Sequence, residues 1–339
     1  MKKLVIGSFL VLLIVLLGLL LGRSLAVNYL HKPLATEQSG ILLLTVERGD
    51  TARTIVQQVN QHFKRGSQLL DYRLSQLLIG IDRLQTGLYE VAPQDSWKTL
   101  WQKLAEGDEK QFQVTLIEGL RFQQWLQTLS KQPYIETTLS IDNVSELLPF
   151  SSNYPSPEGL FLPETYTYRA GTTDVEILTQ AYNAMQDKLA GIWAERSNAS
   201  PVETPYELLI FASIIEKETG IDGERALVAS VFSNRLKKGM RLQSDPTTIY
   251  GIENFDGNLT RAHLREKTAY NTYRIDGLPP TPIAMVSTAS LQAAAQPAES
   301  NYYYFVADNI GGHIFSTTLE AHNRAVYEYQ VKPYRNNKE

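Results

Sequence analysis

Two glutamates, Glu216 and Glu218, come directly after an apolar run in the stretch FASIIEKETG, residues 211–220. Ile and Phe are usually buried in folded proteins, so the two carboxyl groups are expected at the edge of a core. Burial raises the pKa of a carboxyl group, because it disfavours the charged form. A glutamic acid that stays protonated near neutral pH is the group that general acid catalysis needs to split an ether-like bond.

A helix is predicted to position these two glutamates. Thr204 is a typical N-cap with Pro205 at the first helical position, and Gly220 is a typical stop. Both carboxyl groups then lie in the last turn, where the partial negative charge of the helix end disfavours a carboxylate. At ~100° per residue the two side chains point about 160° apart, so periodicity does not choose between them. The alternative is that both are solvated and pair loosely with Lys217 and Arg225.

The N-terminus predicts a membrane anchor. Residues 4–22 are nineteen residues without a charge, close to the ~20 that a helix needs to cross the hydrocarbon core. Lys2 and Lys3 precede them and, by the positive-inside rule, hold the N-terminus in the cytoplasm, although Arg23 weakens the asymmetry. The rest of the chain is then outside. The alternative is a signal peptide cleaved after residues 24–26, which the length of the apolar run disfavours.

A strand-turn-helix pattern occurs three times after a short polar segment. It is present in TVERGDT (residues 45–51), VAPQDS (91–96) and TLIEG (115–119), each followed by apolar residues at helical spacing. Three such units predict a small α+β domain. The V-x-x-G-D-T-x-x-x-I pattern of the first resembles the opening of the LysM module, a peptidoglycan-binding fold. The alternative is that Gly49 only makes a turn and Asp50 only caps a helix.

Composition limits the remaining classes of function. The chain has 339 residues, a net charge of −4 and no cysteine, so about two domains are expected, without disulfides or thiolate metal sites. Nucleic-acid binding is disfavoured, because it normally shows as a basic excess. The five histidines form no His-Glu-x-x-His pair and no G-x-S-x-G motif occurs, so neither a zinc peptidase nor the usual serine hydrolase is predicted. No metal or cofactor is expected.

Five separated blocks resemble, in the same order, the YceG-like family of endolytic murein transglycosylases. The blocks are ASIIEKET, ERALVASVFSNRLKKGMRLQSDPTTIYG, TAYNTY, GLPPTPIA and YYYFVADNIGGHIFSTTLEAHN, and the segment EGLFLPETYTY also matches. The resemblance covers nearly the whole chain beyond the anchor. It implies cleavage of the β-1,4 bond between N-acetylmuramic acid and N-acetylglucosamine in nascent glycan strands, by a domain similar to lysozyme-like lytic transglycosylases.

The resemblance assigns the catalytic acid to the first of the two glutamates, Glu216. In lytic transglycosylation, as the family implies it, one acid protonates the leaving oxygen and then, as a base, takes the proton of the sugar's own 6-hydroxyl. No water is consumed and the product ends in 1,6-anhydro-N-acetylmuramic acid, so a single carboxyl group suffices. Glu218 would be a neighbour whose charge raises the pKa of Glu216.

Weaker assignments concern residues that could bind the glycan. Tyr270 and Asn271 resemble the Tyr-Asn pair that lines the saccharide site of lysozyme-like transglycosylases, and tyrosine rings can stack on sugars. The predicted substrate-binding residues are Glu218, Gln243, Asp245, Tyr250, Tyr270, Asn271, Tyr273 and Glu164. The alternatives are an Asn271 that holds a turn, an Asp245 that caps a helix, and tyrosines that belong to the core.

Together these patterns predict a membrane-anchored α+β protein, with a small LysM-like α+β domain followed by a mainly helical lysozyme-like domain. The predicted divisions are an anchor at 1–25, a tether at 26–40, the LysM-like domain at 41–150 and the lytic transglycosylase domain at 151–339. The expected place is the cytoplasmic membrane, with the catalytic domain outside. Peptidoglycan strands are the expected substrate, and cell-wall synthases such as penicillin-binding proteins are the expected partners. The alternative functions are a non-catalytic wall-binding protein and a scaffold.

Overall fold

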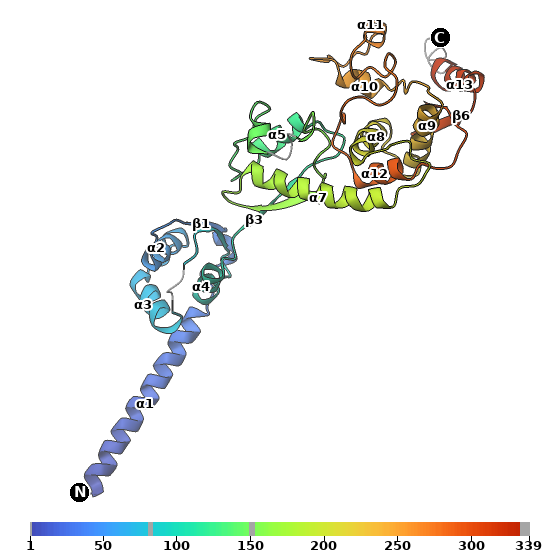
Figure 1. Ribbon diagram of the computed structural model, residues 1–339. Helices are drawn as coiled ribbons and strands as arrows, with labels where there is room; N and C mark the ends of the chain where they lie inside the picture. The colour runs from blue at the N-terminus through green and yellow to red at the C-terminus, as the bar shows by residue number, and fades with distance from the viewer. Residues whose placement is uncertain (1, 81–83, 149–152, 333–339) are drawn as a thin grey trace. The chain divides into compact units, whose positions relative to one another are not determined.

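The structure of the chain, a computed structural model, describes residues 2–80, 84–148 and 153–332 (Figure 1). It divides into two compact units, Met1–Phe112 with Thr167–Gly171 and Gln113–Tyr166 with Thr172–Glu339. Helices and small two-stranded sheets are mixed, which agrees with the predicted α+β class. The sequence placed the domain boundary near residue 150. The chain passes from one compact unit to the other within β3 (Gln111–Thr115), returns within β4 (Thr165–Arg169), and leaves again after Gly171; β3 and β4 are paired.

α1 (Lys2–Leu30) is a single long helix, as the apolar N-terminus predicts. Its stretch Ile6–Leu30 is, in the described part of the chain, the one helix long and apolar enough to cross a membrane, and its residues 6–25 are exposed. It fits a transmembrane anchor. Because the helix continues to Leu30, the first residues of the predicted tether are helical. Leu30 and Leu34 are then buried in the core of the N-terminal unit.

The N-terminal unit combines a two-stranded sheet with helices. After α1 its elements are the short turn η1 (Glu37–Ser39), β1 (Leu42–Val46), α2 (Ala52–His62), α3 (Gln68–Leu78), β2 (Gly87–Val91) and α4 (Trp97–Glu106). β1 and β2 pair antiparallel. Thr51 and Ser96 cap α2 and α4 by accepting from the backbone N–H three residues on. Two of the predicted strand-turn-helix units are thereby confirmed, and β3 with the following helix α5 (Phe122–Ser130) forms the third.

The C-terminal unit is mainly helical. Its further elements are α6 (Val144–Leu147), α7 (Asp174–Ala194), α8 (Pro205–Glu218), α9 (Arg225–Lys237), α10 (Asp245–Tyr250), α11 (Arg261–Arg265), α12 (Thr288–Ala295), β5 (Tyr304–Ala307), β6 (His313–Ser316), α13 (Leu319–Val326) and the short π-helix η3 (Tyr327–Val331). β5 and β6 form an antiparallel pair near the C-terminus.

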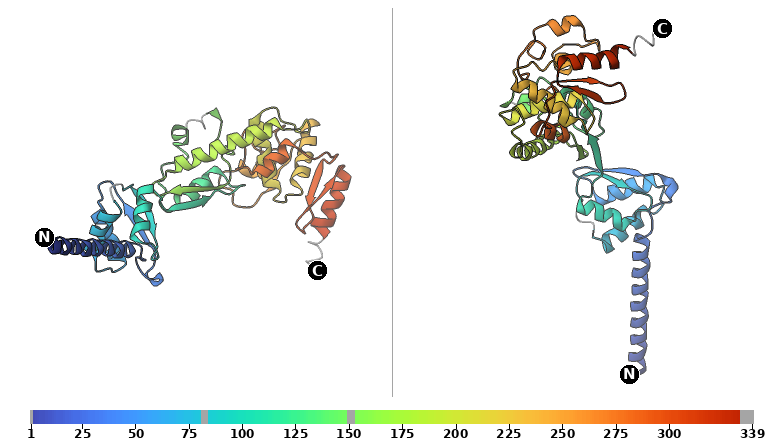
Figure 2. Two further views of the ribbon diagram at one scale, coloured as in Figure 1. Left: turned by 90° about the horizontal axis from the view of Figure 1, so that it is seen from below. Right: turned by 90° about the vertical axis from the view of Figure 1, so that its right-hand side faces the viewer.

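α8 is the central helix of this unit. It contacts α7, α9, α10 and α12, and every residue from Leu208 to Ile215 is buried. A helix that is apolar on all sides belongs inside a core. Thr204 caps α8 by accepting from the N–H of Glu207 at 3.1 Å, and Pro205 is its first residue, as predicted. The ribbons of α8 and α12 lie side by side (Figures 1 and 2), so the last turn of α8 emerges between neighbouring helices.

Candidate active site

The last turn of α8 directs its two glutamates to different parts of the unit. Glu216 Oε2 accepts hydrogen bonds from Ser287 N at 3.0 Å and from Ser287 Oγ at 2.5 Å. Ser287 is the N-cap residue of α12, so Glu216 joins the end of α8 to the start of α12. Glu218 lies on another side of α8, where its Oε1 accepts from Ser244 Oγ at 2.5 Å. The two carboxyl groups therefore have separate partners.

The alternative of two solvated glutamates paired with Lys217 and Arg225 is wrong for this structure. Lys217 Nζ donates to the carbonyl oxygen of Gly119 at 2.9 Å, and Arg225 pairs with Asp222. Among the ion pairs of the described residues, none involves either glutamate. Hydroxyl and N–H donors, not cations, hold both carboxyl groups.

The pKa of Glu218 is raised to about 7. Desolvation by burial is the largest cause, and the hydrogen bond from Ser244 partly offsets it. The carboxylate of Asp245 raises the pKa further, whereas the charges of His313 and Arg235 lower it. At neutral pH the group is therefore divided between its protonated and charged forms. That suits a residue that must first donate and then accept a proton.

Glu218 lines a cavity of about 380 Å³. The walls come from the end of α8, from α9, from the segment that enters α10, and from β5 and α13. The lining residues are Glu218, Phe232, Arg235, Leu242, Gln243, Asp245, Tyr273, Tyr304, Phe305, Leu319, His322 and Asn323. Apolar and aromatic walls with a few polar groups are typical of sites that bind small ligands or parts of polymers. No cluster of three or more metal-ligating side chains occurs in the part of the chain that the structure describes.

Three further residues predicted from the sequence lie at this cavity: Gln243, Asp245 and Tyr273. Tyr273 Oη donates to Asp245 Oδ1 at 2.7 Å. Burial, followed by this hydrogen bond, raises the pKa of Tyr273, so the phenol remains a donor at neutral pH. The N-cap residue of α10 is Ser244, and Asp245 is the first residue of the helix. The alternative in which Asp245 is the N-cap is therefore wrong. Gln243 has a φ of 52°, uncommon for a residue other than glycine.

Asn271 does not reach this cavity. It is fully buried. Its amide nitrogen donates to the carbonyl oxygens of His263 and Glu266, at 3.1 and 2.6 Å. Its amide oxygen accepts from Thr248 Oγ1 and from the backbone N–H of Tyr273. The side chain therefore holds the turn that presents Tyr273, which is the alternative that the sequence left open.

Tyr250, Tyr270 and Glu164 are also absent from the cavity wall. The rings of Tyr250 and Tyr270 pack on one another, with centroids 4.8 Å apart, and the hydroxyl of Tyr270 lies 2.9 Å from that of Thr281. Glu164 is an exposed residue directly before β4. Both tyrosines are half-buried and pack on one another away from this cavity.

Glu158 is a buried acid that was not predicted from the sequence. Its Oε1 accepts from the N–H of Phe122 at 2.9 Å and its Oε2 from the hydroxyl of Tyr250 at 3.2 Å. Burial raises the pKa of Glu158 to about 7, although both hydrogen bonds and the charge of Arg121 lower it. The apolar residues that follow it in EGLFLP were the signal for this burial.

Three polar residues of the cavity wall, Arg235, His322 and Asn323, were also missed. Arg235 donates to the carbonyl oxygen of Leu242 at 2.7 Å, and its guanidinium lies 5.2 Å from the centroid of the Tyr304 ring. The ring of His322 stacks on the same Tyr304 ring, with 5.3 Å between the ring centroids. Their sole signal in the sequence was membership of the blocks that resemble a known family.

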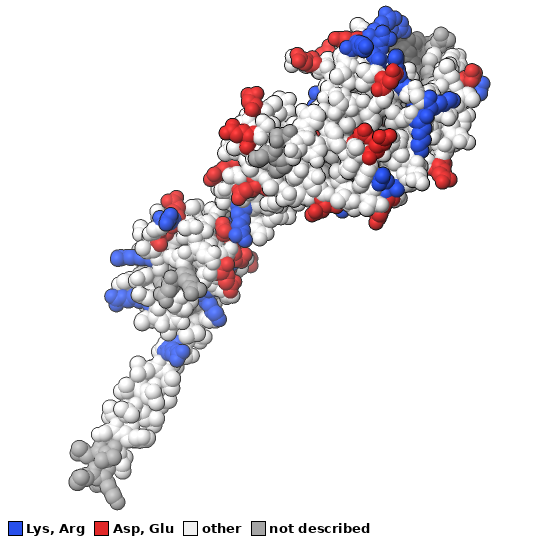
Figure 3. Space-filling model, viewed as in Figure 1, with Lys and Arg blue, Asp and Glu red and all other residues white. Residues whose placement is uncertain are grey.

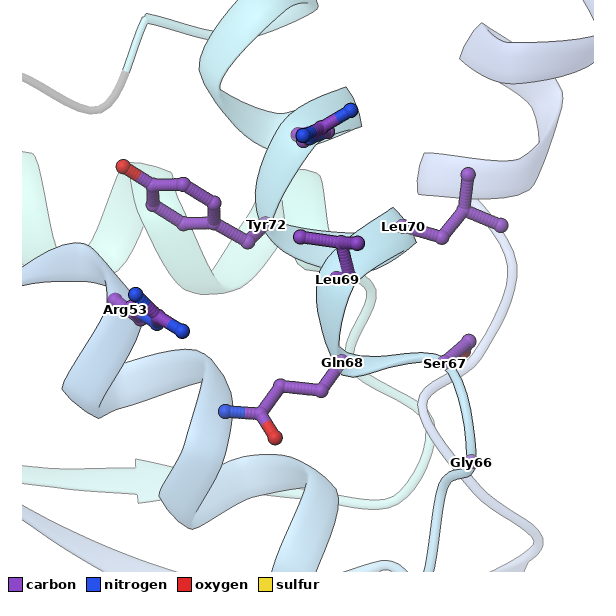
Figure 4. Close-up of a pocket in the computed structure, with 8 residues that line it drawn as sticks. Arg53, Gly66, Ser67, Gln68, Leu69, Leu70 and Tyr72 are labelled. Carbon is purple, nitrogen blue, oxygen red and sulfur yellow. The ribbon is translucent and has the colours of Figure 1, made fainter.

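A larger cavity of about 870 Å³ lies in the N-terminal unit, beside α2 and α3 (Figure 4). Arg53 projects toward it from α2, and Gln68 and Tyr72 project from α3. No Asp or Glu is among the described residues that line it, so none of them can serve as the acid in catalysis.

The chain is similar to proteins already described. A model of the YceG-like family matches residues 44–328. An endolytic murein transglycosylase of Bacillus subtilis (strain 168) is 31% identical over 268 residues, which are 74% of each chain. One of Streptococcus pneumoniae serotype 2 (strain D39) is 30% identical over 178 residues, 51% of this chain and 32% of that one. A crystal structure of a yceG-like protein from Listeria monocytogenes aligns with a TM-score of 0.54 and 26% identity, covering 84% of this chain and 99% of that one.

Proposed function

The chain belongs to the YceG-like family and is a murein transglycosylase, a lyase, and we propose that Glu218 is its catalytic acid in place of Glu216. One observation carries the proposal. Glu218 places a carboxyl group with a pKa of about 7 at the wall of a cavity. Glu216 is not among the residues that line this cavity, and both hydrogen bonds to its Oε2 come from the cap of α12.

We propose cleavage of the β-1,4 bond between N-acetylmuramic acid and N-acetylglucosamine within a glycan strand. Protonated Glu218 gives its proton to the glycosidic oxygen, and the bond from this oxygen to C1 of the muramic acid breaks. The resulting carboxylate takes the proton of the 6-hydroxyl of that sugar, whose oxygen bonds to C1. One fragment then ends in a 1,6-anhydro ring and the other in a free 4-hydroxyl. Glu218 recovers its proton and no water is consumed.

The surroundings of Glu218 support this cycle. Ser244 donates to Oε1, while Oε2 accepts no hydrogen bond from the described residues and is left for the substrate. Tyr273 and Asp245 form a hydrogen-bonded pair on the same wall. Asn323 adds an amide for sugar hydroxyls or acetamido groups. Aromatic walls can stack on sugar rings.

Analysis of the product ends tests this assignment. The full chain and its Glu218→Gln and Glu216→Gln variants are incubated with isolated glycan strands, and the new ends are identified by mass spectrometry. Anhydro ends from wild type and Glu216→Gln, but not from Glu218→Gln, are the expected result. Full activity of Glu218→Gln would overturn the assignment. Reducing ends would show a hydrolase that uses water.

We propose that α1 keeps the chain in the cytoplasmic membrane, with the N-terminus in the cytoplasm and both units outside. The apolar helix and the preceding Lys2 and Lys3 support this topology. Mass spectrometry of the mature N-terminus tests it. A chain that begins at Val27 would identify a cleaved signal peptide and overturn the anchor.

We also propose that the N-terminal unit is LysM-like and binds glycan without chemistry, and that cell-wall synthases such as penicillin-binding proteins are partners. The strand-turn-helix units, and a cavity lined by no described Asp or Glu, support the first of these. Retention of the full chain on insoluble peptidoglycan should weaken when Gln68 or Tyr72 is replaced by Ala. Unchanged retention would leave this unit without a glycan site. Co-purification with synthases after crosslinking in membranes tests the partners.

A further inference from the structure

Helix α3 buries two polar residues and leaves three leucines exposed. Its fully buried residues are Asp71 and Ser75, and Tyr72, Leu74 and Leu78 are partly buried against the core. Its exposed face carries Leu69, Leu70 and Leu77, which are 62%, 49% and 78% exposed. A helix on a surface that meets water normally keeps polar and charged residues on its outer face, so this row of leucines is unusual.

A network of hydrogen bonds fixes α3 in this orientation. The buried carboxylate of Asp71 accepts from Tyr29 Oη at 2.7 Å, from Ser67 Oγ at 3.2 Å and from Arg65 at 3.3 Å. Rotation of α3 to bury its leucines would break this network and leave a charge without partners, which is costly. Tyr29 belongs to the last turn of α1, so the network also attaches α3 to the end of the proposed anchor.

The attachment places α3 at the level where the membrane ends. Arg23 is the first charge after the apolar run and marks the edge of the hydrocarbon core. Val27 lies four residues further, about 6 Å along the helix axis, and shares a small cavity with Leu78 and Ile79 at the end of α3. The headgroup layer beyond the hydrocarbon core is about 5–8 Å thick. In a chain anchored by α1, the end of α3 that carries Leu77 would therefore lie at the depth of lipid headgroups.

The charges around α3 are basic. Arg53 and Arg73 line the cavity beside this helix, and Lys98 lines the small cavity at the end of α1. None of these three forms an ion pair with a described residue. Figure 3 shows basic side chains, on the face that it draws, where α1 leaves the N-terminal unit. Leucines beside basic residues are the pattern of a helix that lies in the membrane interface.

We propose that α3 is a second membrane contact, with its Leu69, Leu70 and Leu77 face in the interfacial layer of the bilayer and with Arg53 and Arg73 at the phosphates of anionic lipids. The proposal rests on the α1 anchor of the proposed function. It goes beyond that function, because it assigns a lipid-binding surface to the unit that carries no acid for catalysis. A second copy of the chain is the competing occupant of the leucine face.

The absence of cysteine from the chain makes the test direct. A single Gln76→Cys variant, at an exposed position of α3, is labelled with a polarity-sensitive fluorophore and reconstituted as full chain into vesicles with spin-labelled phospholipids. Leu16→Cys in the middle of α1 and Ile310→Cys, 89% exposed in the C-terminal unit, are the controls. We expect strong quenching at position 16, a blue shift and quenching by headgroup-level spin labels at position 76, and neither at position 310.

Each outcome separates the contact from the anchor. No quenching at position 16 would overturn the anchor and this inference with it. If position 16 is quenched but position 76 shows neither a blue shift nor quenching, as expected for position 310, the α3 contact alone is overturned. A rapid disulfide between copies through Gln76→Cys, at a low ratio of protein to lipid, would show a second copy on the leucine face and also overturn it.

Two sets of substitutions assign the contact to side chains. Replacing Leu69, Leu70 and Leu77 together by Gln should abolish the blue shift at position 76, and folding should persist because all three are exposed. Replacing Arg53 and Arg73 by Gln should remove the stronger quenching expected in anionic than in zwitterionic vesicles. Equal quenching of the unsubstituted chain in both kinds of vesicle would overturn the role of the arginines.

Discussion

Glu158, which is buried, and Glu218, which is half-buried, are two glutamates of one unit, and the pKa of each is raised to about 7. Their surroundings differ in one respect. Glu158 is 4% exposed, and internal donors occupy both of its oxygens. Glu218 accepts from Ser244 through one oxygen and borders a cavity with the other side of its carboxyl group. A raised pKa thus indicates burial, whereas access to a cavity indicates the acid that can reach a substrate.

The largest expected effect is the loss of activity in Glu218→Gln. Glutamine keeps the size of the side chain but has no proton to transfer, so the chemical step should slow by ~10²–10⁴-fold, the usual contribution of general acid catalysis. Glu158→Gln is the matched control and should keep activity within a few-fold. Initial rates of anhydro-end formation measure both. Equal losses in the two variants would remove the distinction between the two sites.

Glu158→Gln should change the pH dependence of the free energy of unfolding, although it leaves activity nearly unchanged. The folded pKa of Glu158, about 7, is above its ordinary value of 4.5, so its contribution is fully present below pH 4.5 and is lost as pH rises through 7. The loss is about 3 kcal/mol. Between pH 5 and pH 8 the free energy of unfolding should therefore fall less in the variant than in wild type, as measured by urea denaturation. Parallel pH dependences would contradict a buried, neutral Glu158.

The pH profile of wild type sharpens the comparison further. Because only protonated Glu218 can donate, kcat/KM should fall about tenfold per pH unit above pH 7. The same descending limb is expected in Glu158→Gln, since that residue takes no part in proton transfer. If the descending limb moved when Glu158 is replaced, the limb would report the titration of Glu158 and not of Glu218.

The smallest effect is expected for Glu216→Gln. The carboxylate at the start of α12 is stabilised by the positive end of that helix, so its neutralisation should cost about 0.5–1 kcal/mol. Thermal unfolding measures this cost, and Ser287→Ala should give a loss of similar size. Catalytic activity should stay within a few-fold. An activity loss as large as that of Glu218→Gln would instead support Glu216 as the catalytic acid.

Local sequence was enough to predict several elements of the fold. The Thr204-Pro205 start of α8 and the Thr51 cap of α2 depend on neighbours within four residues, and both are confirmed. The apolar N-terminal helix follows from a single uninterrupted run. Family membership was also predictable, because it depends on blocks of residues and not on which atoms meet.

The choice between the two glutamates was not predictable in the same way. It depends on Ser244, 26 residues after Glu218, and on Ser287, 71 residues after Glu216. Neither serine stands out in the sequence. The role of the buried Asn271 was left open for a similar reason, since its four hydrogen-bond partners come from three separate segments. The burial of Asp71 on α3 likewise depends on a partner on α1.

The junction between α1 and the N-terminal unit has a consequence for association with other molecules of the same membrane. Leu30 and Leu34 are part of the core of this unit, and Tyr29 is bonded to Asp71, so the helix enters the unit without a flexible linker. A domain tethered by a flexible linker loses orientational freedom each time it binds a partner, and that entropy loss weakens binding. Here the direct connection to α1 already restricts the orientation of the N-terminal unit. Encounters within the plane of the membrane then begin from a restricted set of orientations, which favours fast and repeated docking.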